Sequence, residues 1–271
     1  MGQDAASEAH HCRNTNVSGQ AKRRPRTKEQ KLNMGLFDFF KNKPKLTDEN
    51  SDNQTLPNKA ELKNHLDSIQ KEVYLLLKPI GFKKKGRTFN RQSEDGIYQV
   101  INIQSGRYEF GDKYVIPGFR ENYYGKFTVN LGVMVREIYE LESHNKPKDI
   151  YQDYDCQIRT RLTHLTIKQD LWWTISDDNH QTTNEVIEGI NSHGLEWLDT
   201  FENRDKICRN WGNVADSSRR AKLDVALIEL HRDREKAQKL FQKYYDDIEI
   251  KNEHKEYVKG LADRLRINLK D

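Results

Sequence analysis

Residues 126–136 read KFTVNLGVMVR, and the alternation within this stretch sets the expected fold class. Apolar side chains occupy every odd position from 127 to 135, and polar or small residues occupy most positions between them. Successive side chains of a β-strand point to opposite faces, so a period of two predicts an amphipathic strand with one face on a core. A β-sheet is therefore expected at the centre of the fold.

Turn signals on the N-terminal side of this stretch add further strands. Residues 82–91 alternate and are interrupted at Gly86, which predicts a strand or a tight pair of strands. Asp95 and Gly96 form a strong turn signal into an apolar run at 97–104, so a hairpin is expected there. More strands are expected over residues 156–162 and 167–175.

Helical periodicity brackets the predicted sheet. Apolar residues recur every three or four positions over 58–78, where Asn58 and Glu61 make a plausible capping box. From Thr182 the chain is expected to be helical to its end, with Thr182 and Glu185 as a second capping box. The last helices are expected over residues 218–231, 234–247 and 253–266. The predicted fold is α+β, a mostly antiparallel sheet packed against helices, with a C-terminal helical hairpin region.

Three regions follow from these patterns. Residues 1–57 are polar and lack a hydrophobic period, so we expect a disordered tail and linker. Because Met34 begins a second plausible start, residues 1–33 are interpreted as an extension outside the working protein. Residues 58–203 are expected to form the α+β domain, and residues 204–271 a C-terminal helical extension.

Charge is concentrated in the first 33 residues. The net charge of the chain is +4, and residues 1–33 carry seven basic and three acidic side chains, so the remainder is neutral. Proteins that grip phosphate backbones usually carry a basic surplus in their folded part, so no nucleic-acid partner is expected. A short aromatic cluster with a basic flank predicts weak peripheral membrane contact or docking onto a partner, with packing onto the protein's own core as the alternative. That cluster comprises Leu36, Phe37, Phe39 and Phe40.

The cysteines and the hydropathy indicate a compartment. Cys12, Cys156 and Cys208 are odd in number and far apart, which argues against a disulfide framework or a zinc ribbon. No apolar run approaches the roughly 18–20 residues that a membrane-spanning helix needs. We therefore expect a cytoplasmic protein with reduced thiols.

Motifs that carry chemistry are absent from the sequence. Neither a phosphate-binding glycine loop nor a nucleophile elbow occurs, so no cofactor is expected and no catalytic residue is assigned. Histidines are scattered singly, so no metal ligand set is expected. The acid-x-Lys triplets that a metal-dependent nuclease uses fall in or beside predicted helices, at residues 61–63, 249–251 and 253–255.

A polar face on the predicted sheet is the candidate ligand site. Arginine and tryptophan side chains suit an anionic or aromatic ligand, or an acidic side chain of a partner protein. The structural alternative is that Asp155 pairs with the arginines while the tryptophans fill the space between sheet and helices. The candidate residues are Arg87, Asn102, Asn130, Arg159, Arg161, Trp172 and Trp173.

Several phrases, in their order along the chain, resemble a protein family. They read LKPIGFKKKGRTFNR at 77–91, VINIQ at 100–104, FTVNLGV at 127–133, CQIRTRL at 156–162 and DLWW at 170–173. Together they resemble the bacterial domain-of-unknown-function family 4304, over about residues 60–200. The resemblance implies a fold and a cytoplasmic bacterial setting, and it implies no reaction. The loop at 105–124 is longer than is usual for the family.

Two functions remain open on this evidence. The leading hypothesis is a non-enzymatic binding or interaction module, of a stress, defence or toxin-neutralising system, with a protein partner. The alternative is a hydrolase or nucleotide-handling enzyme whose site is assembled from residues of the sheet face. A deep pocket with convergent polar groups favours the enzyme, and a flatter aromatic patch favours the binder. The sequence leaves the oligomeric state open.

Overall fold

A computed structural model describes most of the chain from residue 58 onward. Contacts divide the chain into two compact units, residues 1–54 and 55–271, and every described residue lies in the second. The predictions for residues 1–57, including the aromatic cluster, lie outside the described residues, as does most of the 105–124 loop. The structure describes residues 58–106, 115–116, 121–143, 146–176, 179–211, 219–248 and 253–270.

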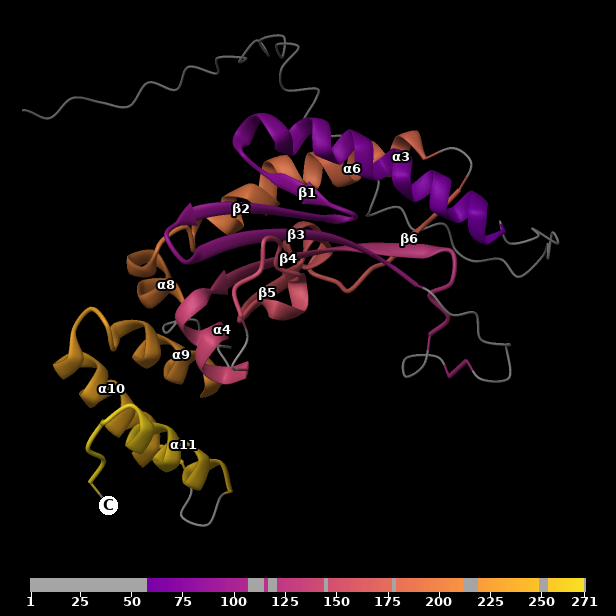
Figure 1. Cartoon of the computed structure of the whole chain (residues 1–271). Helices are drawn as coiled ribbons and strands as arrows, with labels where there is room; N and C mark the ends of the chain where they lie inside the picture. Colours follow the sequence, from indigo (N-terminus) through magenta and orange to yellow (C-terminus); the bar gives the residue numbers. More distant parts are fainter. Residues whose placement is uncertain are drawn as a thin grey trace, which may run out of the picture. The chain divides into compact units, whose positions relative to one another are not determined.

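The described residues form a six-stranded sheet in which every strand pair is antiparallel (Figure 1). The strand order is β1-β2-β3-β4-β5, and β6 pairs with β4. The α+β class predicted from the sequence is confirmed. The strands are β1 Lys83–Lys85, β2 Thr88–Glu94, β3 Ile97–Ser105, β4 Lys126–Val135, β5 Ile158–Arg161 and β6 Trp173–Thr174.

Helices precede, interrupt and follow these strands. The helix at the N-terminal end of the described region is α3, Lys59–Leu77, and its Asn58–Glu61 capping box is present as predicted. The other helical segments are η1 Lys78–Ile80, α4 Arg136–Ser143, η3 Asp153–Asp155, α5 Leu162–Thr166, α6 His180–Gly189, η4 Ile190–Gly194, α7 Leu195–Asp199, α8 Arg204–Asn210, α9 Arg219–Glu229, α10 Arg234–Asp246 and α11 Glu253–Arg264.

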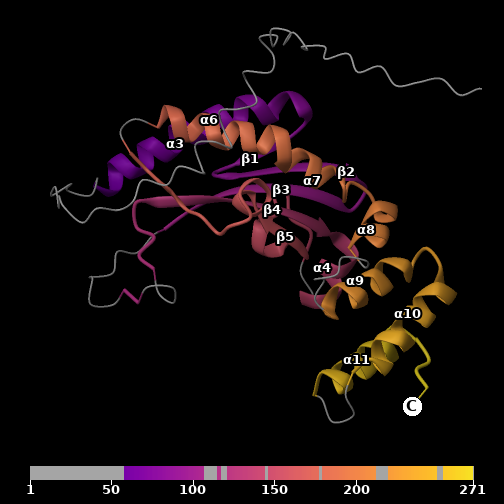
Figure 2. The same ribbon diagram turned by 180° about the vertical axis from the view of Figure 1, so that it is seen from behind.

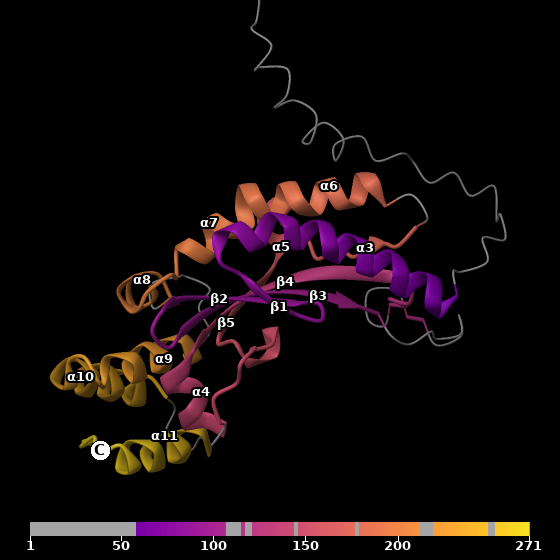
Figure 3. The same cartoon turned by 45° about the horizontal axis from the view of Figure 1, so that its top comes forward.

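One face of the sheet packs against α3 and α6, which lie side by side over it (Figure 3). The odd-numbered residues 127–135 of β4 are buried on this face, and so are Ile69 and Val73 of α3 and Val186 of α6. Burial of these apolar side chains provides most of the free energy that holds sheet and helices together. We call the opposite side of the sheet the open face.

β4 departs from the one-sided burial that its sequence predicts. Residues 127–135 are all buried, so the even-numbered side chains on the open face are enclosed as well. A second, smaller cluster covers that end of the strand, where Met134 packs with Val100, Tyr139 and Tyr151. Its neighbours β3, β5 and β6 cover the edges of the strand, while this cluster and the η3 turn cover its open face.

The structure corrects three local predictions. The strand expected over 167–175 is reduced to the two residues of β6, and the one expected over 156–162 begins at Ile158 and ends where α5 starts. Thr182 does not cap a helix, because α6 begins at His180 and Asn179 precedes it. In each case, pairing with β4 and packing on α5 outweigh the local propensity of a short segment.

The three C-terminal helices match the predicted positions and share the main core. Leu223 of α9, Phe241 of α10 and Leu261 of α11 belong to the same hydrophobic cluster as the sheet and α3. Figure 2, seen from behind, shows α9 adjacent to α8 and α4, with α10 beside α9. The predicted division at residue 203 stays a prediction.

Candidate functional site

Four polar side chains form one row across the open face of the sheet, and we call them the polar row. The register pairs Thr88 with Asn102, Asn102 with Asn130, and Asn130 with Arg161. Directly opposite residues of neighbouring strands share a face, so β2, β3, β4 and β5 each contribute one side chain to the row. Two β-hairpins and a long connection are needed to bring these residues together.

A groove of about 1020 Å³ lies over the polar row, and we call it the sheet groove. Its floor is Thr88, Asn102 and Arg161, together with Gln104 of β3. Asn130 lies beneath it and donates hydrogen bonds to Gln104 (2.8 Å) and Asp153 (3.0 Å). The walls come from three places, namely Lys85, Gly86 and Arg87 of the β1–β2 turn, Gln152, Asp153 and Tyr154 at η3, and the ring pair Tyr123 and Trp172.

The β1–β2 turn places Arg87 at the groove because of one glycine. Gly86 has a φ of +59°, a left-handed conformation that favours glycine and permits a two-residue turn. The Arg87 guanidinium donates a hydrogen bond to Ser105 Oγ at 2.8 Å. This bond uses one of five N–H donors, so the side chain is held in place while the rest of its fork remains available.

Arg161 and Trp172 form the wall at the other side. The Arg161 guanidinium lies over the Trp172 ring, 5.3 Å from its centroid, and Tyr123 stacks on Trp172 at 4.3 Å. Arg161 also pairs with Asp170, which is half exposed. Trp172 Nε1 is a buried donor that has no acceptor among the described residues.

Two of the residues expected at the site lie elsewhere. Arg159 is exposed and pairs in register with Gly132, one step along the sheet from the polar row, and it does not line the groove. Trp173 points to the helical face, where it stacks on Phe127 at 5.5 Å. For Trp173 the explanation is the period of two, which sends it to the face opposite to that of its neighbour Trp172. Arg159 shares a face with Arg161 but lies two residues away along β5, outside the groove lining.

The structural alternative weighed from the sequence fails for the arginines. Asp155 is bound by Lys148 Nζ at 2.9 Å and by no arginine. Its carboxylate instead caps the η3 turn through the Gln152 backbone N–H. The same alternative holds that the tryptophans fill the space between sheet and helices. This is true of Trp173 and is not true of Trp172, which lines the groove.

Asp153 is the one carboxylate that lines the groove among the described residues. Burial raises the pKa of Asp153 above its usual value, and this effect outweighs the opposing pull of the Arg159 charge and the Asn130 hydrogen bond. Lys85, Arg87 and Arg161 line the same groove, so its lining holds more cations than carboxylates, although Arg161 is also paired with Asp170 outside the lining.

Sequence reasoning missed most of this site for an identifiable reason. Gln104 and Thr88 were not predicted, although the alternation of β3 and the register of the first hairpin carry a signal that would have placed them on the same face as Asn102. Gln152, Asp153 and Tyr154 lie in a short 3-10 turn that no periodicity marks. Their place over the sheet depends on long-range bonds, such as those between Asn90 and the Tyr151 backbone.

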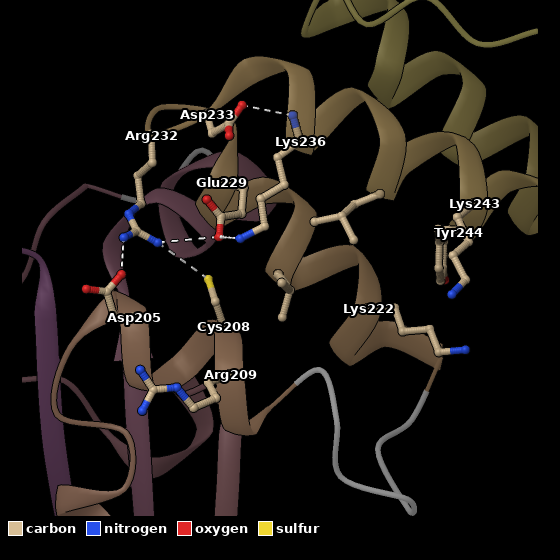
Figure 4. Close-up of a pocket in the computed structure, with 12 residues that line it drawn as sticks. Asp205, Cys208, Arg209, Lys222, Glu229, Arg232, Asp233, Lys236, Lys243 and Tyr244 are labelled. Carbon is tan, nitrogen blue, oxygen red and sulfur yellow. Dashed lines mark hydrogen bonds and ion pairs between the residues drawn. The ribbon is translucent and has the colours of Figure 1, made fainter. Parts of the chain in front are cut away.

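A second cavity, of about 620 Å³, lies where α8, α9 and α10 meet (Figure 4). At its centre the buried Glu229 carboxylate accepts from Lys236 Nζ at 2.5 Å and Arg232 at 3.4 Å, and Arg232 also pairs with Asp205. Burial, helped by the Glu229 charge, raises the pKa of Cys208 to about 12, so the thiol is protonated and a poor nucleophile. These charges satisfy one another, which indicates a structural joint between helices.

Figure 4 also shows how the remaining cations of this cavity lie. Arg209, Lys222 and Lys243 stand at its margins and do not converge on the Glu229 cluster. Lys222 is directed to Asp247 instead, at 3.5 Å. We therefore assign the sheet groove, and not this cavity, as the candidate site.

Metal and membrane features were searched over the described ranges. No group of three or more His, Cys, Asp or Glu side chains there is arranged to hold a metal ion. The acid-x-Lys triplets at 61–63 and 253–255 lie in helices α3 and α11, and the one at 249–251 lies outside the described residues. Within the same ranges, no helix has both the length and the apolar character that crossing a membrane requires.

Comparison with known proteins identifies a family and nothing closer. No curated protein and no solved structure matches the chain. A protein-family model matches residues 73–200, a span that contains all six strands and every residue of the groove floor and walls. Over these residues the chain matches the family described as Domain of unknown function (DUF4304).

Proposed function

We propose that the protein is a non-enzymatic binding module that holds a small anionic ligand in the sheet groove. The observation that carries the proposal is the convergence of Lys85, Arg87 and Arg161 on one concavity whose floor is the polar row. The groove lining holds three cations and one carboxylate, with Asp170 paired to Arg161 from outside the lining, although the chain beyond residue 33 is neutral overall. A local positive field in a partly enclosed site attracts anions more strongly than the same charges spread over a surface.

The groups available in the groove suit an anion with several oxygen atoms. Arg87 presents a fork that pairs two oxygens of a phosphate or carboxylate at once. Lys85 is exposed, and no described side chain pairs with it, so it adds a second charge without an internal competitor. Arg161 is steadied by Trp172 and Asp170, which lowers the entropy lost when it binds a ligand.

Binding is favoured over hydrolysis by what the groove hydroxyls contact. Thr88 donates to Gln152 Oε1 at 2.7 Å, and Ser105 Oγ accepts from Arg87. Neither hydroxyl is hydrogen-bonded to a histidine or a carboxylate that would act as its base. The buried thiol of Cys156 has a pKa raised well above its usual value, so it is protonated at neutral pH.

A second candidate function rests on Asp153. A carboxyl group whose pKa is raised, in a groove with cations, is a pattern that acid catalysts share. Hydrolysis of an ester or anhydride bond in the ligand is then the expected activity, and Asp153→Asn is the variant that abolishes it. Turnover of a bound ligand that persists in Asp153→Asn contradicts this candidate.

We also propose the cytoplasm as the working compartment, with a protein of a stress, defence or toxin-neutralising system as the setting. Both described cysteines, Cys156 and Cys208, are free thiols. Free thiols without a disulfide are typical of proteins in a reducing environment.

The test of the proposed function is calorimetric titration of the full chain with phosphate, pyrophosphate, citrate and nucleoside phosphates. At least one anion is expected to bind in a 1:1 ratio. Arg87→Ala and Arg161→Ala each weaken binding by about 10- to 100-fold, since a charged hydrogen bond contributes about 1.5–3 kcal/mol.

Matched controls lie two residues from the key cations on the same strands. Arg159→Ala on β5 and Lys83→Ala on β1 remove exposed cations that do not line the groove. Both are expected to change affinity less than threefold, through long-range charge alone. If Arg159→Ala and Arg161→Ala reduce the binding affinity equally, the binding site lies outside the groove and the proposal is wrong.

A further inference from the structure

Amide groups on the groove floor leave unused hydrogen-bonding atoms that face the same space. Asn102 donates to Thr88 Oγ1 at 2.8 Å, and Thr88 in turn donates to Gln152 Oε1. These two hydrogen bonds leave Asn102 Oδ1 as an acceptor and Gln152 Nε2 as a donor, and neither atom has a partner among the described residues. Asn130 occupies Gln104 Oε1 in the same way and leaves Gln104 Nε2 as a further donor.

Such an alternation of donors and acceptors matches the edge of a heterocyclic base. Asparagine and glutamine amides pair with adjacent donor and acceptor atoms of nucleobases, which a phosphate alone does not offer. A simple anion satisfies the cations of the groove but leaves Asn102 Oδ1 facing it without a donor. The floor therefore favours a ligand with an uncharged polar edge in addition to its anionic group.

Aromatic side chains in the walls point to a planar ring. Tyr154 is 70% exposed at the groove, and although Lys148 Nζ lies over its ring at 5.9 Å from the centroid, the exposed part of the ring can stack. Trp172 and Tyr123 stack on each other in another wall of the groove, and the buried Trp172 Nε1 lacks an acceptor among the described residues. A buried N–H without an acceptor is costly, and a ligand oxygen or ring nitrogen would remove that cost.

The wall that carries Arg87 and the wall that carries Trp172 lie at opposite sides of the groove. Arg87 precedes β2, while Trp172 precedes β6, and β3 and β4 lie between these two strands. Three strand spacings of about 4.8 Å make this distance roughly 14 Å. An extended ligand is required to touch both walls, and the volume of about 1020 Å³ accommodates one.

We infer that the ligand of the sheet groove is a nucleotide, a nucleoside mono- or diphosphate. Its base stacks on the aromatic wall of Tyr154, Trp172 and Tyr123 and is contacted by the amides of Asn102 and Gln104. Its phosphate is bound by Lys85 and Arg87 at the β1–β2 turn. The inference rests on the proposed function, because it names the class of anion that the same groove holds.

The deciding experiment compares whole nucleotides with their parts on the full chain. Calorimetry measures adenosine, guanosine, cytidine and uridine 5′-mono- and diphosphates against ribose 5-phosphate and inorganic pyrophosphate. At least one nucleotide is expected to bind about tenfold or more tightly than ribose 5-phosphate, because stacking of a base adds to the phosphate contacts.

The outcomes separate this inference from the proposed function. Ribose 5-phosphate or pyrophosphate that binds as tightly as every nucleotide overturns the inference and leaves an anion-binding groove intact. If no anion in either panel binds, both the inference and the proposed function fall.

Separate variants test the contacts to the base and the contacts to the phosphate. Tyr154→Ala is expected to remove the nucleotide preference, about tenfold, while ribose 5-phosphate affinity changes less than twofold. Lys85→Ala is expected to weaken nucleotides and ribose 5-phosphate equally, and Lys83→Ala on the same strand is its control. Tyr257→Ala, which removes a part-exposed tyrosine on α11, controls for loss of an aromatic ring.

Trp172→Phe provides a second and milder probe. It keeps a ring for stacking but removes Nε1, so affinity for the preferred base is expected to fall severalfold with little change for ribose 5-phosphate. If Tyr154→Ala and Trp172→Phe weaken ribose 5-phosphate as much as the nucleotide, the rings only support the fold and the inference is wrong. Melting temperatures of both variants verify that they remain folded.

Discussion

At the scale of single residues, burial and charge compete at Asp153. Its carboxyl group lies in the groove near the Arg159 charge and accepts from Asn130, and both contacts favour the ionised form. Desolvation is the larger effect, so the pKa of Asp153 is raised. At Asp224 on α9 burial is again the larger effect, and it raises the pKa despite the ion pair with Arg220 at 2.9 Å.

The first prediction concerns Asp153 and pH. A raised folded-state pKa means that the folded chain binds the proton more tightly, so this contribution to stability is present below the unfolded pKa and is lost as pH rises through the folded value. Asp153→Asn is expected to lose less unfolding free energy than the wild type between about pH 4 and about pH 7. Denaturant titrations at several pH values measure this, with Asp67→Asn, an exposed site on α3, as control. An unchanged slope in Asp153→Asn contradicts the prediction.

The second prediction concerns the two described cysteines. The thiolate is the reactive form, and burial raises the pKa of Cys208 to about 12 and that of Cys156 well above its usual value. In a Cys12→Ser variant, neither remaining thiol is expected to react with iodoacetamide at about pH 8 until the protein is unfolded. Mass spectrometry of labelled peptides with and without denaturant gives the answer. Rapid labelling of the native chain at Cys208 would show that the α8–α9 joint opens.

At the scale of elements, β4 depends on a glycine in its open-face row. A Cβ placed on Gly132 would lie 2.6 Å from Cys156 Sγ and 2.8 Å from Cys156 Cβ, well inside contact distance. Gly132 thus lets the segment that leads from η3 to β5 approach the sheet closely. That segment carries Gln152 and Asp153, so the glycine also determines how the groove wall lies over the polar row.

The third prediction is that Gly132→Ala destabilises the protein by about 1–3 kcal/mol, the usual cost of overpacking a core. Cys156→Gly in the same chain removes both clashing atoms and is expected to restore part of the loss. Gly260→Ala in α11 is the matched control, since no atom lies within 4 Å of its added Cβ. There the change is expected to stabilise by about 0.5–1 kcal/mol, because alanine favours helices. Chemical denaturation measures the free energy of unfolding of all three variants. If Gly132→Ala is as stable as the wild type, the packing argument is wrong.

At the scale of the whole molecule, a single hydrophobic cluster joins regions that the sequence separates. Leu66 and Val129 belong to this cluster, and so do Ala226, Phe241 and Val258 of the C-terminal helices. A shared core couples the stabilities of its parts, so we expect cooperative unfolding across residue 203.

The fourth prediction tests this coupling. Trp172, Trp173 and Trp197 precede residue 203 and Trp211 follows it, so in a Trp211→Phe background the fluorescence reports on the part before the proposed boundary. Phe241→Ala, at a fully buried site on α10, is expected to cost about 3–5 kcal/mol and to shift the fluorescence and far-ultraviolet circular dichroism midpoints together. Lys239→Ala, an exposed change on the same helix, is the control. A fluorescence midpoint that stays at the wild-type value means that residue 203 is a true domain boundary.

Some residues of the candidate site could be predicted from sequence patterns, and the others are brought to the site only by tertiary packing. Arg87, Asn102, Asn130 and Arg161 lie on or beside strands with readable alternation, so their common face follows from the period of two. Arg159 shares β5 and its open face with Arg161, and Trp173 lies on β6 next to Trp172, so only the tertiary structure shows that both lie outside the groove. Gln152, Asp153 and Tyr154 have no pattern of their own.

The sequence by itself determined the fold class, the central strand, the first hairpin, the capped helix α3 and the three final helices, because each depends on local periodicity or turn chemistry. Only the tertiary structure decided that both faces of β4 are enclosed, that β6 is two residues long and that η3 closes the groove. These features depend on contacts between residues far apart in the chain, such as Asn90 with Tyr151 and Asn130 with Asp153. The free energy of such contacts depends on which segments meet, and no local window of residues contains that information.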